Sequence, residues 1–184
     1  EGQVFRYDFR STWSDYLYNG LYSELTNFKD VYRLSKDSGV NYNKSYMGIS
    51  LVCQSWIYSI LTDTYGDIPY FQSNQGKDSL RYEPAFDRQK DIYLDIFNKL
   101  EQANTLLASN TAIIASSDPV YGGNISRWRK FNNSLYLRLL LRVSGKTEVA
   151  DMVKAKIKEI VETNAANYPI FASNDESAIL RWTG

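Results

Sequence analysis

The sequence predicts an all-α fold of irregular antiparallel helix pairs, and three observations lead to this prediction. Apolar residues recur every three to four positions along five separate stretches, which is the period of an amphipathic helix. No stretch alternates apolar and polar residues over the length of a strand. Short segments rich in turn residues separate the five stretches, so the helices are expected to pack as antiparallel neighbours, as in helical repeats. Their unequal spacing does not fit a regular tetratricopeptide array with its period of about 34 residues.

The first two stretches predict one helix from about 12 to 35 and a second from about 43 to 64. Ser11 is suited to cap the first helix because its hydroxyl can accept from an amide of the first turn. The second helix is apolar on more than one side, so it should lie deep in the fold, with Trp56 and Ile60 enclosed. Replacing Trp56 by alanine is then expected to cost about 3 to 5 kcal/mol.

Three further stretches predict helices at 87 to 109, from 127 to Gly145, and at 147 to 164. The first of these opens at Asp87 and has acidic residues in its first turns, as the helix dipole favours. Glycine is typical just after a helix, and Gly145 stands at that position at the end of the helix that begins at 127. The last helix sets an apolar stripe against several lysines, which is typical of a surface helix.

The composition excludes several classes of function. Lys+Arg 21 balance Asp+Glu 21, so no overall charge attracts nucleic acid or an anionic membrane. The chain has no histidine and one cysteine, Cys53, which removes the usual zinc ligands and the Ser-His-Asp and Cys-His arrangements. We therefore expect no metal, no cofactor and no nucleic-acid partner. The 184 residues suit one domain, and no run approaches the ~20 apolar residues of a membrane span.

The stretch LTDTYGDIPY, residues 61–70, can be explained as a structural stop after the second helix. Gly66 suits the left-handed position that closes a helix, and Asp67 can bond nearby backbone amides. Pro69 prevents further helix and favours an extended Ile68. Each residue thus has a structural explanation.

A catalytic interpretation of the same stretch would make Asp63 and Asp67 the acid pair of a glycosidase, flanked by Tyr65 and Tyr70 as platforms for sugar rings. Such enzymes need two carboxyl groups at a defined separation, one of them with a raised pKa. Nothing in the sequence sets that separation. We therefore prefer the structural interpretation and expect no hydrolysis.

Basic residues form two further patterns. The run SRWRKF at 126–131 resembles a nucleic-acid patch, but without a wider basic surface it is better explained as a helix start with Trp128 packed inward. Arg138 and Arg142 lie four residues apart on one face of an apolar helix. They either extend to water or pair with carboxylates elsewhere, and a partly buried ion pair is the preferred interpretation.

Three blocks of the sequence together resemble one protein family. They are LTDTYGDIPY, YEPAFDRQKDIYLDIFNKLEQANTLL and DPVYGGNISRWRKFNNSLYLRLLLRVS. In this order they are similar to the SusD/RagB family of surface nutrient-binding lipoproteins from Bacteroidetes. The resemblance is strongest from Tyr46 to Ser144, and WSDYLYNGLYSEL upstream looks like the family's first helix. Asn132 departs from the pattern, because a small residue is more usual there.

The resemblance implies an all-α, tetratricopeptide-like scaffold that binds a glycan or other nutrient without cleaving it. It implies delivery of that ligand to a SusC-like TonB-dependent transporter at the outer membrane. It also implies that residues 1–184 are a single helical domain of a longer protein, held at the cell surface by a lipid anchor that this chain does not contain. Within the family signature stand Tyr65, Gly66, Asp67, Pro69 and Tyr70.

The ligand contacts expected from this chain are the aromatic residues Phe5, Tyr7 and Trp13, because stacking on a sugar ring needs an unburied aromatic face. A function from another class stays open beside this one. A helical adaptor module could use an aromatic groove to bind a protein or peptide.

Overall fold

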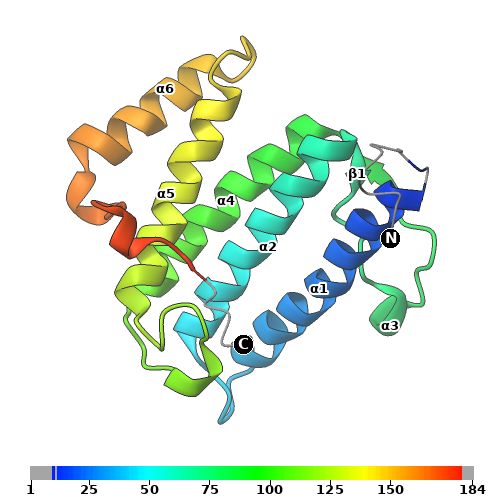
Figure 1. The fold of residues 1–184 in the computed structure, drawn as a ribbon, viewed down its shortest axis with the longest axis horizontal. Helices are drawn as coiled ribbons and strands as arrows, with labels where there is room; N and C mark the ends of the chain where they lie inside the picture. The colour runs from blue at the N-terminus through cyan, green and yellow to red at the C-terminus, as the bar shows by residue number, and fades with distance from the viewer. Residues whose placement is uncertain (1–9, 11, 180–184) are drawn as a thin grey trace, which may run out of the picture.

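The structure is a computed structural model and describes residue 10 and residues 12–179. Within these residues the chain forms five main helices, as predicted (Figure 1). They are α1 (Thr12–Lys36), α2 (Lys44–Tyr65), α4 (Gln89–Ala108), α5 (Ile125–Val143) and α6 (Ala150–Lys158). A short helix α3 (Gly76–Ser79) and the strands β1 (Ile68–Pro69) and β2 (Phe86–Asp87) lie between α2 and α4. The remaining elements are a π-helical turn at Glu159–Thr163 and short 3-10 turns at Ala115–Ser117, Ala165–Asn167 and Asn174–Glu176.

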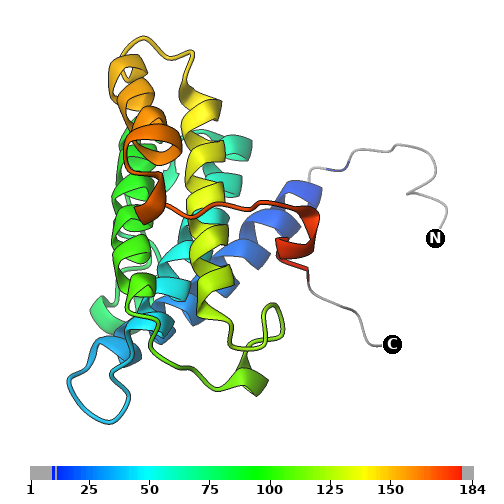
Figure 2. The same ribbon diagram turned by 90° about the vertical axis from the view of Figure 1, so that its left-hand side faces the viewer.

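The main helices pack antiparallel in their order along the chain, with α2 at the centre. Helix α2 contacts α1 on one side and α4 on the other, and it also touches α5 (Figures 1 and 2). Helix α5 in turn packs on α4 and α6. The core consists of side chains from these helices and the π-helical turn that are almost inaccessible to solvent: Leu25, Val52, Tyr58, Leu61, Ile92, Ile96, Leu100, Leu107, Leu140, Val153 and Ile160. None of the helices in the described residues is long and apolar enough to cross a membrane.

The two strands are two residues long and pair antiparallel, with Ile68 opposite Asp87 and Pro69 opposite Phe86. They tie the start and the end of the α2–α4 connection together. The all-α prediction therefore holds. Helix α4 begins at Gln89, two residues later than predicted, because Asp87 belongs to β2 and its carboxylate accepts from the Tyr70 and Phe71 amides instead.

Two other predicted boundaries differ from the structure. Helix α5 begins at Ile125, because the side chain of Asn124 caps it by accepting from the amide of Arg127 at 3.1 Å. The single surface helix expected at 147–164 is instead α6 followed by the π-helical turn. The predicted cap Ser11 lies outside the described residues.

The prediction that Trp56 and Ile60 are deeply buried is wrong. Trp56 is 45% exposed and Ile60 is half-buried. Both line a shallow depression beside α5, whereas Tyr58 and Leu61, on other sides of α2, form the core. Helix α2 is apolar around most of its circumference, so periodicity could not indicate which apolar side faces solvent.

Asn132, the departure from the family pattern, belongs to a buried polar seam between α4 and α5. It is fully buried and donates to the carbonyl of Leu100 and to the side chain of Asn133, both at 3.0 Å. Asn133 donates to Asn104 and to the carbonyl of Pro169. The seam therefore joins α4 and α5 and fixes the C-terminal segment that crosses α5 in Figure 2.

Candidate functional site

The C-terminal end of α2 is closed by Gly66. Its amide donates to the carbonyl of Thr62 at 2.9 Å, and the Thr62 hydroxyl donates to the carbonyl of Gly66 at 2.6 Å. The φ of +78° agrees with the predicted need for glycine, but ψ is −120°, which is not the left-handed helical conformation that was expected. Glycine adopts this conformation without steric cost, which suits Gly66 to the point where the chain leaves the helix.

Asp67 connects this turn to the start of α4. Its carboxylate accepts from the amide of Gln89 at 2.9 Å, far along the chain and not in its own turn as predicted. The side-chain amide of Gln89 donates back to the carbonyl of Thr62 at 2.6 Å. An acidic side chain at a helix N-terminus satisfies an open amide and complements the dipole. The role of Asp67 is therefore to lock α4 against the end of α2.

The two tyrosines of the motif both make contacts within the fold. Tyr70 is 3% exposed and donates to Asp95 at 2.7 Å, and burial, followed by this hydrogen bond, raises the pKa of Tyr70. Tyr65 is half-buried, packs edge-on against Tyr18 and donates to the carbonyl of Ser14 at 2.7 Å. A sugar platform needs an open aromatic face, which the buried ring of Tyr70 does not offer. Pro69 sits in β1, where its carbonyl accepts from Tyr22.

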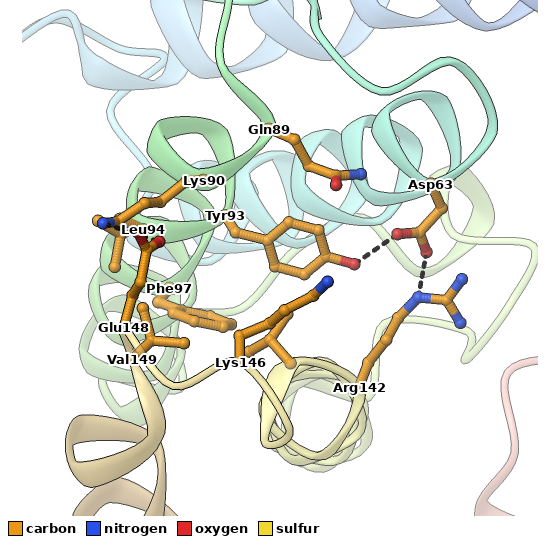
Figure 3. A pocket seen from close by; sticks show the side chains of 11 residues that line it. Asp63, Gln89, Lys90, Tyr93, Leu94, Phe97, Arg142, Lys146, Glu148 and Val149 are labelled. Atoms are coloured by element: carbon orange, nitrogen blue, oxygen red, sulfur yellow. Dashed lines mark hydrogen bonds and ion pairs between the residues drawn. The ribbon is translucent and has the colours of Figure 1, made fainter.

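Asp63, in the last turn of α2, is shared by three helices. One of its oxygens accepts from the Tyr93 hydroxyl of α4 at 2.6 Å, and the other accepts from Arg142 Nε of α5 at 2.8 Å (Figure 3). Burial, followed by the hydrogen bond from Tyr93 to Asp63, raises the pKa of the Tyr93 hydroxyl. The predicted partly buried ion pair is thus confirmed for Arg142, while Arg138 is exposed.

A pocket of about 410 Å³ opens beside this trio, between the end of α2, the start of α4 and the α5–α6 turn (Figure 3). Its charged lining consists of Asp63, Lys90, Arg142, Lys146 and Glu148. The other lining residues are Gln89, Tyr93, Leu94, Phe97, Val143 and Val149. The pocket is of a size that small-molecule sites have, and its lining combines polar and apolar side chains.

The structure does not bring Asp63 and Asp67, the acid pair of the catalytic interpretation that was not preferred, together in this pocket. Asp63 lines it, whereas Asp67 does not and instead binds the Gln89 amide. Both carboxylates have structural partners, as the preferred interpretation requires. Tyr93 and Lys146 were missed, because a tyrosine within a helix and a lysine in the turn between two helices look like ordinary packing and surface residues in sequence.

Of the three predicted ligand contacts, the structure describes Trp13 alone. Trp13 stands in the first turn of α1, does not line the pocket and is 39% exposed. Phe5 and Tyr7 lie outside the described residues.

The contacts of the basic run at 126–131 agree with its interpretation as a helix start with Trp128 packed inward. Trp128 is buried, and its indole N–H donates to Asp118 at 2.8 Å. Arg129 donates to Asn104 within the polar seam, and Lys130 forms an ion pair with Glu176. These contacts fix the α5 helix to its surroundings and leave no continuous basic stacking patch in this run.

Comparison with known proteins decides the family. A family model described as starch-binding and associating with the outer membrane matches residues 1–184. The chain belongs to the SusD-like family. This family consists of binding proteins and not of enzymes, in agreement with the expectation from the sequence. No curated protein matches the chain.

Solved structures with the SusD-like fold agree with the architecture. A chitin-binding protein is 26% identical, with a TM-score of 0.76 over 94% of this chain and 35% of its own. A SusD homologue from Bacteroides fragilis is 29% identical, with a TM-score of 0.72 over 86% of this chain and 32% of its own. A SusD homologue from Bacteroides uniformis is 28% identical, with a TM-score of 0.73 over 89% of this chain and 31% of its own. The chain therefore spans about a third of the length of these structures.

Proposed function

We propose that this chain takes part in the non-catalytic binding of a glycan or other nutrient at the cell surface and in its delivery to a SusC-like TonB-dependent transporter. The match of the starch-binding family model to residues 1–184 carries this proposal. The similarity to a chitin-binding protein over 94% of the chain supports a polysaccharide fragment as ligand. In the proposal, residues 1–184 act as one helical domain of a longer, lipid-anchored protein.

The state of the two aspartates supports binding without hydrolysis. A glycosidase needs a protonated acid and an ionised partner on either side of the scissile bond. The carboxylate of Asp63 is held by Tyr93 and Arg142, and Asp67 accepts from the amide that begins α4. Side chains bound in this way stabilise the fold and are not positioned to transfer protons to a sugar.

We retain Phe5, Tyr7 and Trp13 as the proposed ligand contacts. Trp13 is the one of the three within the described residues, and its partly exposed indole supports a role in stacking on a sugar ring. A stack of this kind contributes about 1 kcal/mol, which corresponds to an about fivefold change in affinity.

The proposal can be tested with the full-length protein on an array of starch and chitin oligosaccharides. We expect binding to at least one glycan class, and binding that is weaker by about fivefold in Trp13→Ala. Tyr42→Ala is the matched control, because Tyr42 is 50% exposed and follows the opposite end of α1. Binding to no glycan or other nutrient would contradict the proposed function, and an unchanged affinity in Trp13→Ala would remove Trp13 from the site.

Delivery to a transporter needs its own experiment. The full-length protein should be purified from outer membranes with a mild detergent, and a large β-barrel should be recovered in stoichiometric amount. Recovery of the binding protein alone under conditions that preserve other outer-membrane complexes would contradict this part of the proposal.

A further inference from the structure

The pocket at Asp63 is built from the end of α2, the start of α4, the end of α5 and the α5–α6 turn. Its floor is formed by Phe97 and Tyr93, which are 4% and 5% exposed, and Leu94 and Val149 add apolar wall (Figure 3). A volume of about 410 Å³ suffices for one sugar residue, since sites for small molecules begin at roughly 300 Å³.

Both carboxylates of the pocket already have partners. Asp63 accepts from Tyr93 with one oxygen and from Arg142 with the other. Glu148 pairs with Lys90 at 3.1 Å across the opposite side of the pocket. Neither carboxylate is therefore left as a strong acceptor for a ligand.

The polar groups that stay open are mostly donors. Lys146 has no hydrogen-bond or ion-pair partner for its amine among the described residues, and Figure 3 shows this amine directed into the pocket. Arg142 uses Nε for Asp63, which leaves its terminal amino groups. Gln89 donates its amide N–H to Thr62 and keeps its carbonyl oxygen as an acceptor.

The balance of charges in the pocket also favours a ligand that accepts hydrogen bonds. Three cations and two carboxylates line the pocket, so one positive charge is uncompensated, and Lys146 carries it. A ligand with one negative charge would neutralise the pocket, and a carboxylate accepts well from an ammonium group. A phosphate ester, with nearly two negative charges, would leave an excess of negative charge.

We propose that this pocket binds the carboxylate-bearing ring of an acidic sugar, such as a hexuronate, with Lys146 pairing with the carboxylate. The inference rests on the proposed function and names a ligand class for it. The Gln89 carbonyl accepts from a sugar hydroxyl, and the apolar wall at Leu94 and Val149 packs on the C–H side of the ring.

The test is a calorimetric titration of the full-length protein at low salt with galacturonate, galactose and succinate. We expect binding of galacturonate at least tenfold tighter than that of the other two. Lys146→Ala should remove this preference, and Lys146→Arg should keep it because the positive charge remains. Lys154→Ala is the matched control, since Lys154 is an exposed lysine of α6 outside the pocket. Rising salt should weaken the galacturonate signal, because charge attraction at an open pocket is screened.

Three results would overturn the inference. One is no preference for galacturonate over galactose, and another is an unchanged preference in Lys146→Ala. The third is equal binding of succinate, which would mean that the pocket takes any carboxylate and does not recognise a sugar. Binding of the same proteins to the oligosaccharide array separates the two proposals. If the wild type and Lys146→Ala bind neutral glycans equally well and the wild type shows no preference for galacturonate, the pocket inference is wrong. The proposed function then stands.

Discussion

Arg142 on α5 and Asp63 at the end of α2 form an ion pair of 2.8 Å, and the two partners are unequally exposed. The Asp63 side chain is 22% exposed and that of Arg142 is 53% exposed. The carboxylate is thus the less exposed partner, and it is also the acceptor for the Tyr93 hydroxyl. Asp63 therefore connects the ends of three helices.

Removing Asp63 should cost more stability than removing Arg142. In Asp63→Ala the buried Tyr93 hydroxyl loses its acceptor, which costs about 1 to 3 kcal/mol. In Arg142→Ala an exposed guanidinium is lost and Asp63 keeps Tyr93, so the cost should be at most about 1 kcal/mol. Urea unfolding of the two variants measures both values. The reverse order would contradict the description of Asp63 as the acceptor on which both Tyr93 and Arg142 depend.

Gly66→Ala should destabilise the protein through the backbone alone. A methyl group at Gly66 would meet open space, but a φ of +78° with a ψ of −120° is strained for alanine, at a cost of about 1 to 3 kcal/mol. Gly145→Ala is the matched control, because Gly145 also has open space and is not among the glycines with positive φ. Thermal melts should show a lower Tm for Gly66→Ala only. Equal melting temperatures for the two variants would contradict the backbone strain expected for alanine at position 66.

The inner and outer sides of α2 should respond differently to truncation. Leu61→Ala empties a site that is fully buried and should cost about 2 to 5 kcal/mol. Trp56→Ala removes a ring that is 45% exposed, so we expect a smaller loss than the 3 to 5 kcal/mol that full burial would imply. Denaturant midpoints compare the two. A larger loss at Trp56 would show that this ring is enclosed.

The amine of Lys29 should titrate near pH 8. Burial, followed by the positive charge of Lys99, lowers the pKa of Lys29 to about 8. Its amine donates to the carbonyl and hydroxyl of Ser73 at 2.8 and 2.9 Å and has no carboxylate partner among the described residues. The ¹³C resonance of the reductively methylated amine, assigned with Lys29→Arg, measures the pKa. A midpoint near 10.5, the ordinary value, would contradict this prediction.

The same shift has a consequence for stability. Between about pH 8 and 10.5 the unfolded chain carries a proton on Lys29 that the folded chain lacks. Unfolding then takes up a proton, so the contribution of Lys29 to the free energy of unfolding rises with pH across this window. Below pH 8 both states are protonated, and the folded state carries the full cost of the buried charge.

The sequence predicted the helices well because helix formation depends on local periodicity. The same information does not specify how a helix is rotated against its neighbours, which is why Trp56 was placed inside. Contacts between distant segments were also missed. Asp67 was expected to bond within its own turn, whereas its partner is the amide of Gln89.

The pocket could be predicted only in part. The sequence indicated an ion pair for Arg138 or Arg142 but not Asp63 as the partner. Three helices supply Asp63, Tyr93 and Arg142, and their meeting depends on the packing of whole helices and not on any local motif. A resemblance to a family fixes the fold, but it does not identify pockets particular to one chain.

The central claim, binding of a glycan or other nutrient without cleavage, is tested most directly by calorimetric titration of the full-length protein with starch and chitin oligosaccharides. The account predicts saturable heat with a defined stoichiometry and an oligosaccharide that is recovered intact afterwards. Release of new reducing ends that stops in Asp63→Asn/Asp67→Asn would contradict it and would restore these two aspartates as a catalytic pair.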